Sequence, residues 1–233
     1  MKFDELDKQM RVYETAHDHR VIPGLWIAAR LDGRGFTRLC REQIQFEAPF
    51  DERFRTIMTE TTSHLMDCGF KVLYGYTQSD EISLLFDKNI DFFGRKTRKY
   101  DSILAGEDSA KFSLLLGEIA VFDCRLSQLP DRETVIDYFR WRAEDAHRNS
   151  LNSHCYWLLR KENMDAEKAT QFLKGKTVAQ KNELLYSRGV NYNDLPVWQK
   201  RGIGLYRMDG NVQVDLNIPF GDAYGDFIAR FME

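Results

Sequence analysis

Two short stretches of this sequence each place a carboxylate directly after an apolar run. RLDGRGFTRL covers residues 30–39 and carries Asp32-Gly33, whereas YTQSDEISLLF covers residues 76–86 and carries Asp80 between two apolar runs. Two carboxylates within a few ångströms of each other repel unless a proton or a cation lies between them. Oxygen ligands in small number suit Mg²⁺, which completes its shell with water and substrate phosphates. A pair of such ions can activate an attacking oxygen and stabilise a leaving phosphate.

The two stretches meet only if the strands that carry them are neighbours. The apolar and helical spacing predicts strands and helices in the order β-α-β-β-α-β, at 24–31, 52–68, 71–77, 81–86, 100–116 and 118–126. This order is typical of the ferredoxin-like arrangement, an α+β fold. Its first and third strands pair antiparallel in the middle of the sheet, so we expect Asp32 and Asp80 to converge. Gly33, which lacks a Cβ atom, is expected to let its carbonyl and a ligand approach closely.

Each stretch also has a simpler interpretation. Asp-Gly after a strand is a common turn, and Gln78-Ser79-Asp80 between two strands suits a hairpin. Glu81 fits a surface residue or a cap. Taken together, the two stretches still do not separate a polymerase palm from a nucleotide cyclase.

Beyond Pro130 the pattern becomes mainly helical. Thr177 and Gln180 form a predicted capping box, and IGLYRMDGNVQVDL predicts a hairpin over Asp209-Gly210. We therefore expect a palm-like catalytic region over residues 1–130. A helical region with a C-terminal hairpin is expected over 131–233, packed on the first or continuous with it as one domain.

The bulk composition excludes several classes of protein. Of the 233 residues, 43% are hydrophobic and 30% charged, and no apolar run reaches the roughly 18 residues of a membrane helix. The charged N-terminus has no secretory stretch, and the four widely spaced cysteines include no CxxC pair. These features favour reduced thiols in a cytoplasmic protein over a zinc site or a disulfide framework. Because the net charge is −3, any RNA-binding cations must be gathered locally.

Cations do gather in four places. They are Arg95-Lys96 with Arg98-Lys99, Arg140 and Arg142 with His147-Arg148, Arg160-Lys161, and Lys200-Arg201. Each group fits phosphate contacts, which provide affinity without sequence choice, or a solvated helix face. The interpretation as a helix face is favoured for Arg160-Lys161, and phosphate binding for the run at 94–100.

Six motifs in order resemble one known family. They are RLDGRGF, QSDEISLLF, FDCR, HRNSLNSHCYW, KNELLYSRGVNYNDLP and WQKRG, between about residues 24 and 205. Together they resemble the tRNA-histidine guanylyltransferase superfamily, and most of all its bacterial and archaeal guanylyltransferase-like proteins. Those proteins are template-dependent 3′–5′ RNA polymerases that repair truncated tRNA 5′ ends. The resemblance implies a polymerase-type palm, two Mg²⁺ ions, a homotetramer, and tRNA, ATP, GTP and other NTPs as partners.

The resemblance also assigns roles to individual residues. It implies that Mg²⁺ is bound by Asp32, the Gly33 carbonyl and Asp80, the two aspartates being catalytic. Implied nucleotide contacts are Arg30, Gly33, Arg34, Gly35, Phe36, Ser79, Asp80, Lys96 and Lys99, the two lysines gripping a triphosphate. Implied contacts to tRNA or roles in activation are Arg95, Arg98, His147, Asn149, Lys181 and Asn191. Without the resemblance, a lone helical histidine such as His147 is usually structural.

Three departures separate this chain from the eukaryotic histidine-specific enzymes of the superfamily. Thr37 replaces a histidine, Ala48 replaces a lysine, and His147-Arg148-Asn149-Ser150 stands where those enzymes have HINN. The departures favour tRNA 5′-end repair over addition of G to tRNA-His. Addition of G remains the alternative function, and a non-catalytic tRNA-binding protein with a degenerate palm is a second one.

Overall fold

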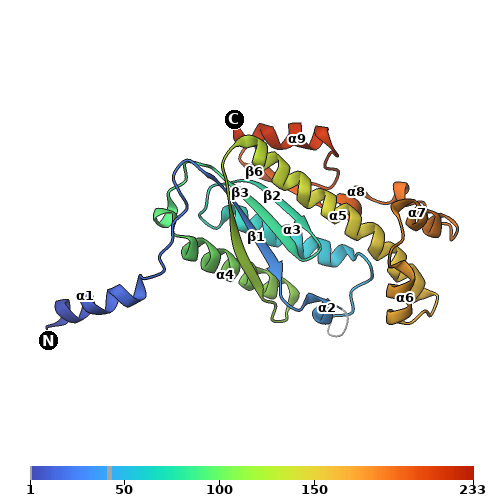
Figure 1. The fold of residues 1–233 in the computed structure, drawn as a ribbon, viewed down its shortest axis with the longest axis horizontal. Coiled ribbons are helices and arrows are strands. Elements are labelled where there is room, and N and C mark those ends of the chain that lie inside the picture. Colours follow the sequence, from blue (N-terminus) through green and yellow to red (C-terminus); the bar gives the residue numbers. More distant parts are fainter. Residues whose placement is uncertain (1, 41–43) are drawn as a thin grey trace.

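The computed structural model describes residues 2–40 and 44–233, which form one six-stranded antiparallel sheet surrounded by helices (Figure 1). The strand order is β4-β1-β3-β2-β5-β6. The strands are β1 (Trp26–Gly33), β2 (Val72–Gln78), β3 (Glu81–Phe86), β4 (Phe122–Leu129), β5 (Ile203–Met208) and β6 (Asn211–Asp215).

The predicted β-α-β-β-α-β order is confirmed. Helix α3 (Glu52–Asp67) connects β1 to β2, and α4 (Thr97–Leu116) connects β3 to β4. Asp51 caps α3 by accepting a hydrogen bond from the Arg53 amide at 2.7 Å. β1 pairs antiparallel with β3 on one side and with β4 on the other. The ferredoxin-like strand order therefore places the two acidic stretches next to each other.

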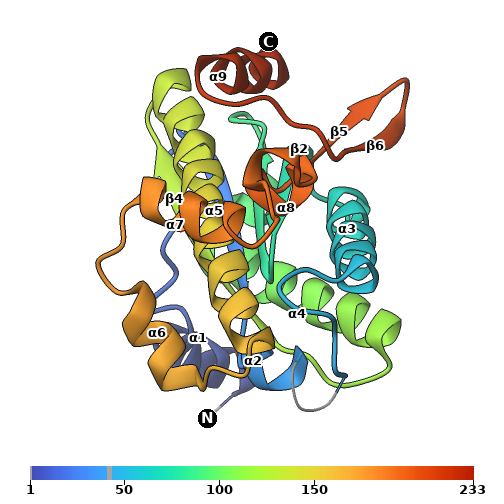
Figure 2. The same ribbon diagram turned by 90° about the vertical axis from the view of Figure 1, so that its right-hand side faces the viewer.

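The two faces of the sheet bury different side chains, as the alternation along a strand requires. One face packs under α3 and α4, with Ile27 and Leu31 of β1 in its core. The other face lies under α5 (Arg132–Lys161) and α9 (Asp222–Ala229), with Trp26 and Ala28 in its core. Figure 2 shows α3 and α4 on one side of the sheet and α5 on the other.

The second half of the chain extends the same sheet. The predicted hairpin over Asp209-Gly210 is confirmed as β5–β6, and β5 pairs with β2. The predicted capping box is also confirmed, because Thr177 and Gln180 exchange hydrogen bonds at the start of α7. The remaining elements are α2 (Phe36–Arg38), η2 (Phe92–Arg95), α6 (Ala166–Leu173), α7 (Val178–Tyr186), η3 (Tyr192–Asp194), α8 (Val197–Arg201) and η4 (Arg230–Met232).

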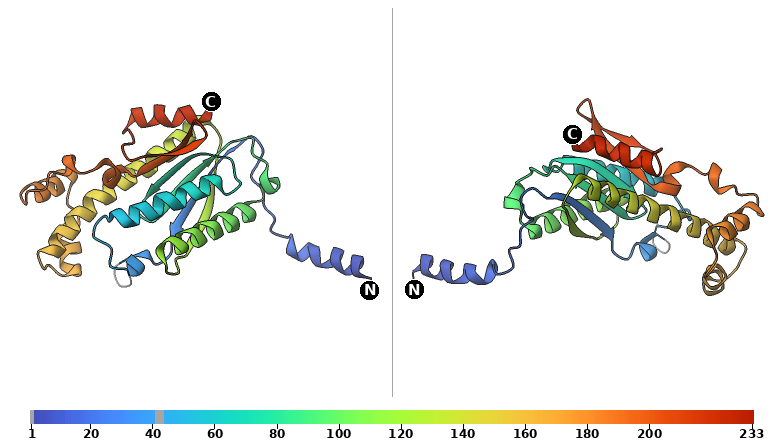
Figure 3. Two further views of the ribbon diagram at one scale, coloured as in Figure 1. Left: turned by 180° about the vertical axis from the view of Figure 1, so that it is seen from behind. Right: turned by 45° about the horizontal axis from the view of Figure 1, so that its top comes forward.

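The N-terminal helix α1 (Phe3–Glu14) stands apart from the rest of the molecule. It projects away from the sheet and its flanking helices (Figure 3), and none of its residues is buried. Among the described residues, none of the helices combines the length and the apolar character needed to cross a membrane.

Candidate active site

The ends of β1 and β3 bring Asp32 and Asp80 together. Asp32 lies opposite Glu81 in the β1–β3 register, and the Gly33 amide donates a hydrogen bond to the Asp80 carbonyl at 3.1 Å. The predicted convergence of the two stretches is therefore confirmed for the backbone. It follows from antiparallel pairing, which places the end of one central strand beside the start of the other.

Within the described residues, no lysine or arginine side chain pairs with either carboxylate. Burial raises the pKa of Asp80 above its ordinary value, the Ser79 hydroxyl that donates to it at 3.0 Å opposes this rise, and the charge of Asp32 adds to it. The Asp32 carboxylate makes no hydrogen bond or ion pair within residues 2–40 and 44–233. A mutually repelling pair of this kind gains stability when a cation lies between its members.

The donor set fits Mg²⁺ better than it fits a closed metal cage. Across the described part of the chain, no three histidine, cysteine or acidic side chains gather as a metal site. Two carboxylates with the nearby Gly33 carbonyl leave most of an octahedral shell to water and phosphate, which is the pattern usual for Mg²⁺.

Gly33 is required by the packing of the turn that follows β1. A Cβ atom at Gly33 would lie 2.4 Å from the ring of Phe36, so the missing side chain makes room for this ring. The expected approach of a ligand to the Gly33 carbonyl stays a prediction. Phe36 is buried and packs against Phe54, Phe112 and Phe122. The turn after β1 is thereby held against the core, with the Asp32 carboxylate left outside it.

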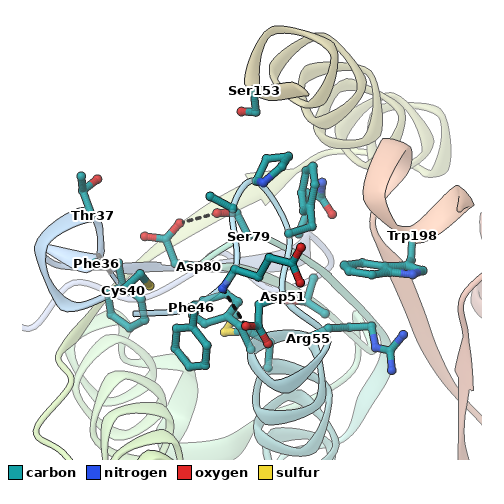
Figure 4. Close-up of a pocket in the computed structure, with 18 of the residues that line it drawn as sticks. Phe36, Thr37, Cys40, Phe46, Asp51, Arg55, Ser79, Asp80, Ser153 and Trp198 are labelled. Carbon is teal, nitrogen blue, oxygen red and sulfur yellow. Dashed lines mark hydrogen bonds between the residues drawn. The ribbon is translucent and has the colours of Figure 1, made fainter. Parts of the chain in front are cut away.

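A cavity of about 330 Å³ opens beside Asp80. Asp80 and Ser79 lie side by side at this cavity, with Ser153 of α5 above them and Trp198 of α8 to one side (Figure 4). Five other aromatic side chains line it, namely Phe36, Phe46, Phe50, Phe54 and Trp157. Flat apolar walls beside carboxylates can accommodate a nucleotide base while its phosphates reach a metal.

Residues 46–55, which we did not predict as part of the site, form much of the cavity wall. Asp51 accepts hydrogen bonds from Arg53 and from the Glu47 amide, and the Arg53 guanidinium is the main reason why its pKa falls to about 2. The Arg55 guanidinium lies 5.0 Å from the ring centroid of Trp198. The FEAPFDERFR stretch combines aromatic and charged residues ahead of a helix. This combination is the feature of the sequence that could have indicated a role in the site.

Ser79 occupies the turn between β2 and β3 in an uncommon backbone conformation. Its φ angle is +54°, in the left-handed region that residues other than glycine rarely adopt. Strained turns of this kind concentrate at functional sites. The conformation places the Ser79 hydroxyl within hydrogen-bonding distance of the Asp80 carboxylate.

Behind the carboxylates lies an ion-pair network that the sequence did not reveal. Glu81 is neither a surface residue nor a cap, because its carboxylate lies 2.8 Å from the Arg142 guanidinium of α5. Arg142 also donates to Asp145 at 2.8 Å, and Arg30 lies 4.0 Å from Glu81. Burial raises the pKa of Glu81, while the charges of Arg142 and Arg30 lower it. Arg142 therefore cross-links α5 to β3, and it is not part of a solvated helix face.

The other predicted residues of this loop remain exposed. Arg34 and Gly35 are exposed where β1 turns into α2, and the Arg34 amide donates to the Val121 carbonyl at 2.8 Å. Their position next to Asp32 is compatible with the predicted nucleotide contacts.

The basic run at 94–100 is largely occupied by structural contacts. Arg95 is buried and donates hydrogen bonds to the backbone carbonyls of Val21, Ile22, Leu25, Lys88 and Ile90. Lys96 and Arg98 both form ion pairs with Asp18. These contacts fasten the segment that follows α1 to the start of α4. Arg95 accordingly has the contacts of a structural residue, whereas we had predicted it to contact tRNA.

The basic run also lies at the far end of the central strands. β3 begins at Glu81 beside Asp32 and ends at Phe86 beside Ile27. Five residues of strand span roughly 17 Å. Lys96 and Lys99 follow that far end, and neither lines the cavity at Asp80 of the same chain. The predicted contact of Lys96 and Lys99 with a triphosphate therefore stays a prediction. Within one chain, the two lysines lie away from the cavity at Asp80.

The remaining predicted residues lie on the helical half. His147 is half-buried between Tyr192 and Phe220, and burial together with Arg201 and Lys200 lowers its pKa. Asn149 donates to Asp145, and Asn191 caps η3. Lys181 lies on α7, where its carbonyl accepts from Cys155. The predicted contacts of these four residues with tRNA remain predictions.

Comparison with known protein families gives matches over nearly the whole chain. The sequence profile of the family described as tRNAHis guanylyltransferase matches residues 7–130, and the profile "Thg1 C terminal domain" matches residues 133–219. The probable tRNA(His) guanylyltransferase of Mus musculus is 31% identical over 192 residues, which are 78% of this chain and 64% of that protein. The tRNA(His) guanylyltransferase of Neurospora crassa is 32% identical over 200 residues, which are 80% of this chain and 68% of that protein. The chain thus spans about two thirds of the length of these relatives.

Solved structures give the same fold. A bacterial tRNA(His) guanylyltransferase (Thg1)-like protein in complex with ATP superposes with a TM-score of 0.85 at 27% identity, covering 97% of this chain and 99% of that one. A tRNA(His) guanylyltransferase from Saccharomyces cerevisiae has a TM-score of 0.77 at 23% identity, covering 88% and 96%. The second similarity concerns the fold alone.

Proposed function

Because the chain belongs to the tRNAHis guanylyltransferase family, we propose that it is a template-dependent 3′–5′ nucleotidyltransferase that adds nucleotides to the 5′ end of truncated tRNA. The main support is the convergence of Asp32 and Asp80 beside an aromatic cavity, with no cationic side chain of residues 2–40 and 44–233 paired to either carboxylate. Phosphoryl transfer depends mainly on positioning and on stabilising charge at phosphate oxygens, and carboxylates with bound Mg²⁺ supply both.

The reaction we propose runs in two steps. The 5′-monophosphate of the tRNA first attacks the α-phosphate of ATP or GTP, and pyrophosphate leaves. The 3′-hydroxyl of the incoming nucleotide then attacks the activated 5′ phosphate, its proton is lost to solvent, and the nucleoside monophosphate leaves. Once the 5′ end carries a triphosphate, the same attack releases pyrophosphate. Base pairing with the tRNA itself selects the nucleotide.

Asp32, Asp80 and the Gly33 carbonyl would hold the two Mg²⁺ ions. These ions would supply Lewis-acid stabilisation of the attacking and leaving oxygens. The chain's own residues do the positioning. The aromatic cavity takes a base, Ser79 donates to the Asp80 carboxylate, and Arg142 holds Glu81 behind Asp32.

Two of the three departures from the histidine-specific enzymes lie at the proposed site. Thr37 and Ala48 both line the cavity beside Asp80. A threonine and an alanine offer a nucleotide neither the ring nor the positive charge of the residues they replace. The wall that meets the substrate is therefore different here, and this difference supports repair over dedicated addition of G to tRNA-His.

We further propose that tRNA, ATP, GTP and other NTPs bind this protein as substrates in the cytoplasm, and that it acts as a homotetramer. The number of subunits rests on the resemblance alone. Light scattering at working concentration tests the tetramer, and a stable monomer would contradict it.

The test is to incubate the protein with Mg²⁺, all four NTPs and a tRNA that lacks its first nucleotide, and to compare full-length tRNA-His under the same conditions. If the protein repairs tRNA, it adds the nucleotide that pairs with the base opposite the gap. Each of the four NTPs is then a substrate when its complementary base stands opposite. Changing that opposite base is the matched control, because the added nucleotide should change with it. Addition of G whatever the opposite base, and only to tRNA-His, would contradict repair.

The names of the relatives favour addition of G to tRNA-His as the second candidate. The same assay separates the two functions. tRNA binding without any nucleotide addition would instead indicate the non-catalytic alternative.

A further inference from the structure

Helix α1 carries an apolar stripe that covers nothing in its own chain. Phe3, Leu6, Met10 and Tyr13 follow one another at spacings of three, four and three residues, and their exposed fractions are 77%, 42%, 53% and 72%. This spacing places them on one side of the helix, as the a and d positions of two heptads. The rest of α1 is mostly charged or polar.

The direction in which α1 projects is fixed by contacts at its base. Asp18 forms ion pairs with Lys96 and Arg98, and Arg20 donates to the Gly94 carbonyl at 2.8 Å. The Thr97 amide donates to the His19 carbonyl at 3.0 Å. Only residues 15–17 separate these contacts from α1. The helix points away from the sheet (Figure 3), and none of its residues is buried.

A free α1 would be poorly stable. Isolated helices shorter than about 12–15 residues are marginal in water, and packing of the apolar face supplies most helical stability in proteins. α1 has 12 residues and buries none of them. Packing of the stripe against a surface outside the chain would therefore stabilise the helix.

The charges of α1 favour a second copy of this chain over nucleic acid or an anionic membrane. The helix has four acidic residues, Asp4, Glu5, Asp7 and Glu14, against the basic residues Lys8 and Arg11. An excess of negative charge opposes binding to phosphates. The stripe itself is self-complementary, because a and d residues pack against the a and d residues of an identical helix.

We propose that α1 pairs in parallel with α1 of a second copy through the stripe of Phe3, Leu6, Met10 and Tyr13. In a parallel pair each g position faces the e position of the next heptad on the partner. Gln9 then faces the partner's Glu14, and Lys2, the N-cap residue that precedes the helix, lies on the side of the partner's Asp7. In an antiparallel pair the e positions face each other, and Asp7 meets the acidic e positions of the other helix. Charge complementarity therefore selects the parallel pair.

The experiment compares two substitutions that put the same charge on the same helix. Met10→Asp places a carboxylate in the stripe, whereas Val12→Asp places it at an exposed apolar position outside the stripe (66% exposed). Light scattering of the full chain over a concentration series measures the mass. We expect Met10→Asp to reduce the mass to that of a smaller species at concentrations where the wild type and Val12→Asp are unchanged. An unchanged mass for Met10→Asp, or a wild type that is monomeric throughout, would overturn the proposal.

Cross-linking tests the orientation. In a parallel pair Met10 faces its own counterpart, whereas Lys8 lies on the outer side. Oxidation of Met10→Cys should give a linked dimer, in which peptide mapping joins position 10 to position 10, faster than oxidation of Lys8→Cys. Equal rates, or no linkage at position 10, would overturn the parallel pair. Nucleotide addition is not a readout here, so a failure of this proposal leaves the proposed function intact.

Discussion

The two ends of the central strands β1 and β3 carry charge in opposite ways. At one end Asp32 and Asp80 converge and no cation within the described residues pairs with either carboxylate. At the other end, Lys96 and Arg98 pair with Asp18, and Arg95 donates to five backbone carbonyls. One end has unpaired acidic groups, and the other end has cations that are already paired.

This difference distinguishes charged residues that stabilise the fold from charged residues that can bind a ligand. A charged residue that is satisfied by its own chain stabilises that chain, as Arg95 does by tying residues 21–25 to the start of α4. Like charges that lie close together without an opposite charge lower the stability of the folded protein. They concentrate at functional sites, where a bound ligand supplies the opposite charge. The acidic end is therefore the end to test for chemistry, and the basic end is the end to test for stability.

The largest effect is expected at the acidic end. Asp80→Asn keeps the shape of the side chain and removes its charge, so we expect the rate of nucleotide addition to fall by about 10³-fold. Single-turnover assays on a 5′-truncated tRNA measure it. Asp87→Asn, just beyond the opposite end of β3, loses only the ion pair with Lys71 and should keep the wild-type rate. Equal rates for the two variants would contradict the assignment of catalysis to the acidic end.

The next effect concerns the cation behind the acidic end. Arg142→Ala leaves Glu81 and Asp145 without their shared partner in a largely buried setting, so the free energy of unfolding should fall by about 2–4 kcal/mol. Urea denaturation measures this change. Arg140→Ala, on the same helix as Arg142, removes a pair with the exposed Asp222 of α9 and should cost less than about 1 kcal/mol. A similar loss in both variants would contradict the role given to Arg142.

A third prediction concerns a carboxyl group that belongs to neither end. Asp108 of α4 is fully buried and has no hydrogen-bond partner among the described residues, and burial raises its pKa well above 3.8. The folded state therefore favours the protonated form. Its contribution to stability is complete below pH 3.8 and is lost as the pH rises through the raised folded pKa.

Asp108→Asn should remove this component of the pH dependence, which amounts to at most about 1.4 kcal/mol per pH unit. Urea denaturation over a pH series measures the slope, and the exposed Asp226→Asn serves as the control. An unchanged slope in Asp108→Asn would show that Asp108 stays ionised in the folded protein.

The smallest effect is expected at the basic end. If Lys96 serves only to hold Asp18, Lys96→Ala should change nucleotide addition by no more than about twofold. Hydrogen exchange of residues 15–22 should become faster, because this segment loses an anchor. A large increase in KM for the NTP, with unchanged exchange, would instead support the triphosphate contact that the family resemblance implies.

Much of the fold and the centre of the site could be predicted because they follow from local patterns and strand order. The helix at α3, the capping box at Thr177 and the hairpin at Asp209-Gly210 are encoded by neighbouring residues. The meeting of Asp32 and Asp80 required only the pairing of the first and third strands.

The contacts made by charged side chains could not be predicted, because their partners lie far away in the sequence. The run at 94–100 shows four cations but does not show that Asp18 and the carbonyls of residues 21–25 bind three of them. Glu81 likewise gives no sign of Arg142 on α5. The cavity formed by residues 46–55 depends on how a loop folds over the sheet, and a loop has no periodicity to reveal this.

Metal binding tests the central claim most directly. Mn²⁺ can replace Mg²⁺ in an oxygen-ligand site and reports its own binding by electron paramagnetic resonance. We expect the wild type and Asp87→Asn to bind Mn²⁺ in the presence of a non-hydrolysable NTP, and Asp32→Asn and Asp80→Asn each to lose most of this binding. If Asp32→Asn and Asp80→Asn both bound Mn²⁺ as tightly as the wild type, the proposed metal site at these two aspartates would be wrong.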